Sequence, residues 1–339
     1  MMDMSYMRRI AEKLHFSFKQ INHVFQLQQE GATIPFMARY RKEATGNLDE
    51  VQIAAVIGEL RYFSELDKRK ETVLKTIEAA GKLTPALKAR IDNCYDAVEL
   101  EDIYLPFKPK RRTRAAMALE KGLEPLAKLI FEQDPGNPET EAADFVNEQV
   151  ADVKDALQGA SDIIAEWVAE QEEARNRIRR LFSQTAMFSA KILPGKKEEE
   201  AAQKYRDYFD FSEPLSQSPS HRVLAIRRGE KEGFLSMDIY VDKETALAEL
   251  EDIFVKTSNA NGQVVKKAVA DGFERLLKPS IENEFRLASK NKADEEAIRV
   301  FSENLRQLLL ASPLGSKRIL AIDPGFRTGC KLVCLDAQG

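Results

Sequence analysis

The stretch DEVQIAAVIGELRYFSELDKRKETVLKTIEAAG, residues 49–81, predicts that helices dominate this fold. Its apolar residues recur near the three- and four-residue spacing of one helical face, at Val51, Ile53, Val56, Ile57, Leu60, Phe63, Leu66, Val73, Leu74 and Ile77. The acids at positions 49 and 50 suit a helix N-terminus, and Gly81 is a stop signal. At about 1.5 Å per residue, the segment predicts a single helix of roughly 45 Å.

Helical patterns continue on both sides of this segment. Residues 3–30 predict two short helices with a tight junction, which could form a helix-turn-helix that reads DNA. An ordinary helical hairpin is the favoured interpretation of that pair. Further helical patterns occupy residues 115–131 and 242–311, and we expect the second to be broken at 259–262 and near Pro279. The predicted fold class is therefore mainly α, built of helical hairpins and long helices.

The middle of the chain is less regular. Residues 196–211 are expected to be helical, and residues 212–220 form a polar, proline-bearing linker. Residues 185–193 could be a strand or a loop, and residues 234–241 show the partial alternation of a strand. Four arginines crowd one helical stretch, where they would complement the dipole at the helix C-terminus: Arg175, Arg177, Arg179 and Arg180.

Basic residues gather in the segments that connect the predicted helices. Residues 104–114 read YLPFKPKRRTR, and their two prolines predict a stiff extended segment. Its cations form what we call the basic arm, residues 108–114, with Lys108, Lys110, Arg111, Arg112 and Arg114. A second cluster lies in the predicted connector 32–48 beside Tyr40, with Arg39, Arg41 and Lys42. A third group follows in residues 220–229, with Arg222, Arg227 and Arg228.

Charge runs of this kind are most often solvated surface. The sharper interpretation is that these cations contact phosphates, because arginine presents a planar fork of donors that suits phosphate oxygens. Neighbouring aromatic residues could stack on a base or anchor the segment. The sequence therefore predicts weak, sequence-independent nucleic-acid binding by the three groups, with pairing to Glu43, Glu101 or Asp102 as the structural alternative.

Composition narrows the class of protein. The chain has 339 residues, of which 43% are hydrophobic and 31% charged, so it can bury a core of two or three domains. Its formal net charge is −4, so nucleic-acid binding has to come from local patches. Three cysteines without CxxC spacing and three scattered histidines predict no zinc site, disulfide framework or cofactor. We expect a cytoplasmic protein without a membrane partner, since no apolar run approaches the ~20 residues of a membrane span.

The last residues change character. Residues 318–322 form a short apolar run that suits a buried strand, and residues 330–335 read as a second strand. Asp323 follows the first of these and is the only candidate for a catalytic carboxylate. A hairpin alone is marginally stable, so we expect this chain to be a fragment cut inside its next domain.

Five blocks of the sequence together resemble the Tex family of bacterial transcription accessory proteins. They are IPFMARYRKEATG at 34–46, DIYLPFKPKRRTR at 102–114, EKGLEPL at 120–126, SHRVLAIRRG at 220–229 and AIDPGFRTGCK at 321–331. The resemblance implies a Tex N-terminal helical domain at 1–193, a helical central region at 194–316 and, at 317–339, the first strands of a truncated YqgF domain with an RNase H-like fold. In the family, helix-hairpin-helix and S1 domains follow.

The resemblance also implies a function in transcription. Family members are similar to a eukaryotic elongation factor and are thought to bind RNA or DNA, with the S1 domain as a main contributor. The expected function is a nucleic-acid-binding scaffold with RNA polymerase or other transcription machinery among its partners. Two alternatives stay open: part of a metal-dependent RNase H-like nuclease that uses Asp323, and a helical module that docks on the transcription machinery. One carboxylate cannot form a metal-dependent site, so we expect no enzyme activity from this chain.

Overall fold

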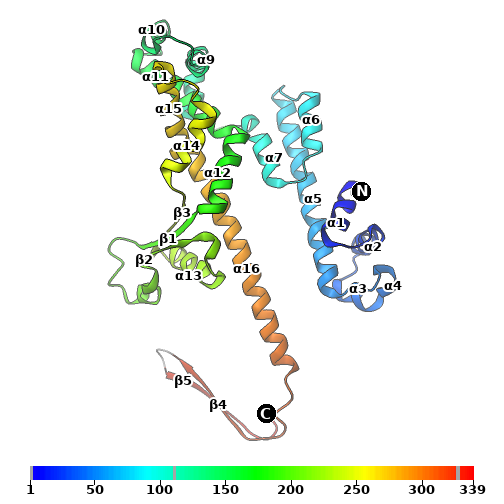
Figure 1. The fold of residues 1–339 in the computed structure, drawn as a ribbon. Coiled ribbons are helices and arrows are strands. Elements are labelled where there is room, and N and C mark those ends of the chain that lie inside the picture. The colour runs from blue at the N-terminus through cyan, green and yellow to red at the C-terminus, as the bar shows by residue number, and fades with distance from the viewer. Residues whose placement is uncertain (1–2, 110–111, 326–328) are drawn as a thin grey trace. The chain divides into compact units, whose positions relative to one another are not determined.

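The computed structural model describes residues 3–109, 112–325 and 329–339. Helices make up most of these residues, which confirms the predicted mainly α fold (Figure 1). The chain forms two compact units, each discontinuous in sequence. The first unit consists of residues 1–179 and 243–279, and the second of residues 180–242 and 280–339. The predicted domain boundaries at 193/194 and 316/317 stay predictions.

The N-terminal part of the first unit is organised around α5 (Glu50–Ala79), which confirms the long helix predicted from residues 49–81. Asp49 and Gln52 form a capping box at its start, and Gly81 follows its end at a φ of 69°. Helices that contact α5 are α1 (Met4–Leu14), α2 (Phe18–Gln29), α3 (Ile34–Tyr40), α6 (Pro85–Asp92) and α7 (Ala97–Tyr104) (Figure 1).

The predicted connector 32–48 is wrong in detail, because most of it is helical. Helix α3 is followed at once by α4 (Lys42–Thr45), and Met37 and Thr45 are fully buried. Helix α4 also packs against α2. The Gln20 side chain donates to the Gly46 carbonyl, and His23 Nδ1 lies 2.5 Å from the Ala44 carbonyl oxygen. The α1–α2 pair thus packs as a helical hairpin onto its neighbours.

The rest of the first unit surrounds α11 (Val153–Glu170), whose buried face carries many alanines. Helices that contact it are α8 (Arg114–Glu120), α9 (Glu124–Glu132), α10 (Pro138–Ala143) and α15 (Ala260–Gly272), and α14 (Lys243–Phe254) packs on α15. Helix α15 approaches α11 closely at Gly272, where a Cβ atom would lie 2.7 Å from the Ala165 carbonyl oxygen. The side chain of Gln133 links α9 to the end of α14 through the backbone of Phe254, Lys256 and Thr257.

The second unit contains a three-stranded antiparallel sheet in the order β2–β1–β3. The strands are β1 (Met187–Ile192), β2 (Asp210–Pro214) and β3 (Leu235–Tyr240), with Met187 paired to both Pro214 and Tyr240. Helix α13 (Ser220–Lys231) packs on β3, which alternates buried and exposed residues. Residues 185–193, for which the sequence left strand and loop open, contain β1, and the strand expected at 234–241 is present as β3.

The structure differs from two further predictions. Residues 196–211, expected to be helical, form a 3₁₀ helix at Glu200–Tyr208 and then the start of β2, which also takes up the beginning of the expected linker. In the first unit, the chain was expected to break near Pro279, but Pro279 is the second residue of α16 (Lys278–Leu310). A π-helical turn, Phe273–Leu277, directly precedes α16, so the regular hydrogen-bond ladder is already interrupted where proline lacks its donor.

The hairpin predicted near the end of the chain is present. Strands β4 (Ile319–Gly325) and β5 (Gly329–Leu335) pair antiparallel from Ile319 with Leu335 to Gly325 with Gly329. Apolar side chains of both strands are exposed, Leu320 and Leu332 among them. In the part of the chain that the structure describes, every helix is too short or too polar to cross a lipid bilayer.

Candidate nucleic-acid interface

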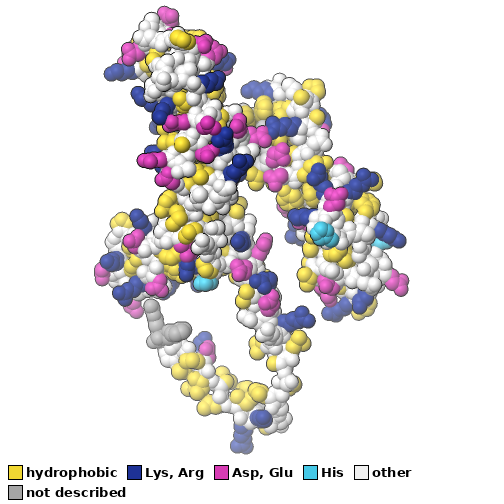
Figure 2. All heavy atoms as spheres, in the orientation of Figure 1, with side chains coloured by type: hydrophobic (Ala, Val, Ile, Leu, Met, Phe, Trp, Pro, Cys, Tyr) yellow, Lys and Arg dark blue, Asp and Glu magenta, His cyan; other side chains and the backbone are white. Residues whose placement is uncertain are grey.

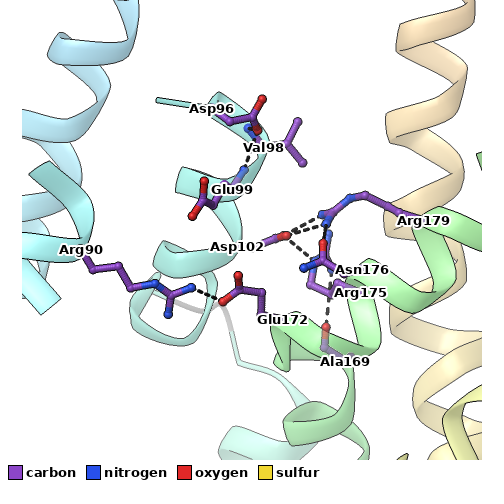
Figure 3. A network of polar contacts seen from close by, with 10 residues as sticks. All are labelled: Arg90, Asp96, Val98, Glu99, Asp102, Ala169, Glu172, Arg175, Asn176 and Arg179. Atoms are coloured by element: carbon purple, nitrogen blue, oxygen red, sulfur yellow. Dashed lines mark hydrogen bonds and ion pairs between the residues drawn. The ribbon is translucent and has the colours of Figure 1, made fainter. Parts of the chain in front are cut away.

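The base of the basic arm is held by a buried carboxylate (Figure 3). Asp102 lies on α7, shortly before the arm, and its side chain is only 3% exposed. Its two oxygens accept hydrogen bonds from Arg175 Nε at 2.6 Å and from Arg179 Nη1 and Nη2 at 2.6 and 2.8 Å. Both arginines come from α12 (Glu172–Thr185). These charge-assisted bonds join α7 to α12 and fix the point from which the arm departs.

Two further ion pairs support the same junction. Arg90 on α6 donates to Glu172 at the start of α12 (Figure 3). Arg69 on α5 donates to both oxygens of Glu101, at 2.5 and 2.9 Å, and its guanidinium lies 5.2 Å from the centre of the Tyr104 ring. The two acids that precede the arm, Glu101 and Asp102, therefore each have an arginine partner from another helix.

This arrangement differs from two expectations. Pairing of Glu101 or Asp102 with the basic clusters was the structural alternative, whereas in the structure both acids bind arginines of α5 and α12. The crowded arginines of α12 were attributed to the helix dipole, but Arg175 and Arg179 bind Asp102, and Arg177 pairs with Glu249 at 2.8 Å. Partners more than 70 residues away left no local spacing signal from which they could be found.

The described part of the arm is exposed. The chain leaves α7 through a 3₁₀ turn, Leu105–Phe107, so the predicted extended conformation is wrong for these three residues. Lys108 and Arg112 are exposed and form no ion pair within the described residues. Arg114 is the first residue of α8, with Thr113 Oγ1 accepting from the Ala116 amide at 3.0 Å. Lys110 and Arg111, also predicted to bind nucleic acid, lie outside the described residues.

Arg114 is close enough to Asp162 on α11 to act on its carboxyl group. Burial raises the pKa of Asp162 above its ordinary value, while the charges of Arg275 and Arg114 oppose that rise. Arg275 lies nearest, with Nη2 3.2 Å from Asp162 Oδ1. Like Lys108 and Arg112, Arg114 is exposed, and these three are the described cations of the arm that an external anion could reach.

The second cluster lies at the other end of the same long helix. We call Arg39 on α3, Arg41 at the junction and Lys42 on α4 the α3–α4 cluster. All three are exposed, and Arg39 Nε lies 3.9 Å from Glu50 at the start of α5. Glu50 and Arg69 are 19 positions apart in α5, or about 29 Å at ~1.5 Å per residue. The α3–α4 cluster and the basic arm therefore form two separate surfaces.

The third group does not present its cations together. Arg222 pairs with Glu213 and lies 5.4 Å from the centre of the Phe211 ring. Arg227 is half-buried and donates to the carbonyl of Arg286 at 3.0 Å, and burial together with the charge of Arg286 lowers its pKa. Arg228 is exposed. Two of these three predicted residues thus serve contacts inside the second unit.

The structure gives Asp323 an exposed position. It lies in β4 with its side chain 76% exposed, and its Oδ2 is 3.9 Å from Lys331 Nζ on β5. Among the described residues, no three His, Cys, Asp or Glu side chains gather as a metal ion requires. Figure 2 shows Lys, Arg, Asp and Glu side chains interspersed over the visible face, as the small net charge leads one to expect.

Comparison with known proteins matches two regions of the chain to models of one family. Residues 4–78 match the model described as Tex-like protein N-terminal domain, and residues 133–301 match the one described as Tex central region-like. The transcriptional accessory protein Tex of Neisseria gonorrhoeae is 39% identical over 342 residues, covering 99% of this chain and 45% of that protein. Protein tex of Bordetella pertussis is 38% identical over 347 residues, covering 98% and 44%.

A more distant similarity extends beyond bacteria. S1 RNA-binding domain-containing protein 1 of Homo sapiens is 29% identical over 328 residues, which covers 92% of this chain and 33% of the human protein. The chain thus spans less than half the length of these curated relatives.

Proposed function

Because the chain belongs to the Tex family, we propose that it acts in transcription as a nucleic-acid-binding scaffold and that the basic arm supplies one contact with phosphates. The names of its relatives support the general function: one is called a transcriptional accessory protein and another is named for an S1 RNA-binding domain. The expected binding is weak and independent of base sequence, because arginine and lysine contacts to phosphate carry no sequence information.

One observation carries the proposal for the arm. Residues 103–119 contain five cations and no acid, and the two acids just before them are already bound by arginines from α5 and α12. The exposed cations Lys108 and Arg112 therefore keep their charge available to an external anion. A structural clamp would instead pair these residues with Glu101 or Asp102, and both of those carboxylates have other partners.

A salt titration tests this function. The Lys108→Ala/Arg112→Ala variant should bind a single-stranded or duplex oligonucleotide with a shallower dependence of log K on log salt concentration. Each lost phosphate contact removes a slope of about 0.7 for single strands or 0.9 for duplex, so we expect a change of about 1.4–1.8. Fluorescence anisotropy of a labelled oligonucleotide between about 50 and 200 mM salt gives the value.

A matched control separates local charge from total charge. Lys13→Ala/Lys88→Ala removes two cations that already pair with Glu59 and Asp92 on the surface of the same unit. That variant should keep the wild-type slope. An unchanged slope in the arm variant, or an equal change in the control, would show that the arm makes no phosphate contact.

We further propose that Asp323 has no catalytic role in this chain and that the protein works in the cytoplasm beside RNA polymerase. The exposure of Asp323 and its pairing with Lys331 support the first part, and a metal-dependent cleavage assay tests it. The free thiols of Cys94, Cys330 and Cys334 suit a reducing compartment. The contact with RNA polymerase is tested by immobilising the protein and measuring whether it retains the polymerase after nuclease treatment.

A further inference from the structure

Two aromatic side chains stand exposed on α3 beside the α3–α4 cluster. Phe36 is 39% exposed and Tyr40 is 72% exposed, one helical turn apart. Their ring centres are 5.5 Å apart, with the planes inclined by 43°. The opposite face of the helix supplies the core contacts, since Met37 and Ala38 are buried there. The exposed rings are therefore not required to hold α3 in place.

A groove of about 350 Å³ opens next to these rings, at the lower end of the usual range for small-molecule sites. The residues around it come from the end of α2, the turn after it and α3–α4: Leu27, Glu30, Gly31, Ala32, Thr33, Phe36 and Arg41. The Arg41 guanidinium lies 5.6 Å from the centre of the Phe36 ring, so a cation and an aromatic face already form one wall. In Figure 2, cationic and hydrophobic side chains lie next to one another at this end of the first unit.

The charges of this surface favour one kind of ligand. Arg39, Arg41 and Lys42 are balanced by three exposed acids nearby, Glu30, Glu43 and Glu50. A surface with balanced charge attracts the phosphates of a duplex only weakly, because duplex binding without base contacts depends on net positive charge. Stacking of an unpaired base on an aromatic ring does not need that excess, since every base offers a flat π-face.

We propose that Phe36, Tyr40 and Arg41 form a stacking site for an unpaired base of single-stranded nucleic acid, a proposal that rests on the function proposed above. The exposed Arg39 and Lys42 contact the flanking phosphates, and the Glu30 carboxylate in the groove accepts hydrogen bonds from base amino groups. Bases inside a duplex are stacked on one another and cannot enter such a site. The α3–α4 cluster therefore selects single strands, whereas the basic arm binds either form.

The experiment compares a single-stranded 12-mer, of roughly the site size of one binding module, with the duplex of the same sequence, using the full 339-residue chain. Tyr40→Ala and Phe36→Ala should each weaken single-strand binding about five- to a hundredfold, the range measured for losing one stacked base, and leave duplex binding within about twofold. A 2-aminopurine at the central position should lose fluorescence on binding to the wild type and recover it with Tyr40→Ala.

Val51→Ala is the matched control, because Val51 is 78% exposed on the neighbouring first turn of α5 and has no ring. It should bind both forms like the wild type, and Tyr40→Phe should retain single-strand binding. An equal loss for single strand and duplex, or no loss for either, overturns the stacking site. If the arm variant still flattens the salt slope in those cases, the proposed function survives; if the wild type binds neither form, both proposals fall.

Discussion

Replacing Asp102 with alanine should be among the most damaging single changes to the first unit. The substitution removes three charge-assisted hydrogen bonds and leaves Arg175, whose side chain is 6% exposed, without the carboxylate that faces it. Breaking a buried ion pair in this way costs about 3–5 kcal/mol, because the remaining charge is held away from water. Arg179 is 17% exposed and can turn outward, so most of the loss arises at Arg175.

The neighbouring acid provides the comparison. Glu101 also accepts two hydrogen bonds from an arginine, but the Glu101 and Arg69 side chains are 46% and 38% exposed. Water can replace their interaction, so Glu101→Ala should cost no more than about 1 kcal/mol. The two alanine substitutions should therefore differ several-fold in the stability that they remove, because Asp102 is buried and Glu101 is not.

Fluorescence of Trp167 is a suitable assay. It is the only tryptophan in the chain and lies on α11. The centre of its ring is 5.6 Å from the centre of the Phe131 ring, so its fluorescence reports the folding of the first unit. With a urea m-value of about 3 kcal/mol per molar, a loss of 3–5 kcal/mol lowers the midpoint by at least ~1 M. Adding Arg175→Leu should recover part of the loss, since the buried arginine that faced Asp102 is then gone.

The reasoning fails if Asp102→Ala and Glu101→Ala both cost less than about 1 kcal/mol. That result would mean that Arg175 finds water or another acceptor without cost. A loss that grows further in the double variant would also contradict it, because it would assign the energy to packing and not to charge.

Two other predictions concern different parts of the chain. Burial, and then the neighbouring Asp67 carboxylate, raises the pKa of the Tyr6 hydroxyl above its ordinary value of 10.0. As pH rises past 10, the unfolded chain therefore loses this proton before the folded chain does, and the stability of the fold decreases. Tyr6→Phe should cost about 1–3 kcal/mol at neutral pH, because Asp67 and Lys70 lose a partner, and should flatten this alkaline loss in denaturation curves at pH 9–11. Incubation of the purified chain with RNA or DNA and Mg²⁺ or Mn²⁺ should give no cleavage; cleavage abolished by Asp323→Ala would restore the nuclease alternative.

The long helix could be predicted because its signals are local. Asp49 and Gln52 cap it, Gly81 ends it at a positive φ, and its apolar spacing matches the buried residues Ile53, Val56 and Leu60. Each of these features acts within a few residues of itself, so the sequence alone contains the information needed.

Strand β2 could not be predicted in the same way. Its residues Asp210–Pro214 show no regular alternation and include a proline, which is unfavourable inside a sheet. It forms because β1 offers an edge, with Ala190 opposite Phe211 and Met187 opposite Pro214. Pro214 lies at the end of an edge strand, where a missing amide donor costs little. The pairing depends on a partner that local patterns do not identify.

In the candidate site, too, local features could be predicted and long-range contacts could not. The cations of residues 108–114 were visible in the sequence, as were those of the α3–α4 cluster. The sequence did not show whether the arm's cations are free to bind a ligand. That depends on Glu101 and Asp102, which bind arginines from distant helices: Arg69, Arg175 and Arg179. Arg222 and Arg227 show the reverse case, in which a basic-looking motif is used for internal contacts.

Both ends of the basic arm are anchored to helices of the first unit. One end is fixed at α7 by Asp102, and the other by the Thr113 cap at the start of α8. Side chains on a segment anchored at both ends lose less conformational freedom when they meet phosphates than those on a free tail. If the arm binds phosphates as proposed, the buried Asp102 network should favour that binding without touching the ligand, because Arg175 and Arg179 occupy the acid that lies nearest to Lys108 in the sequence.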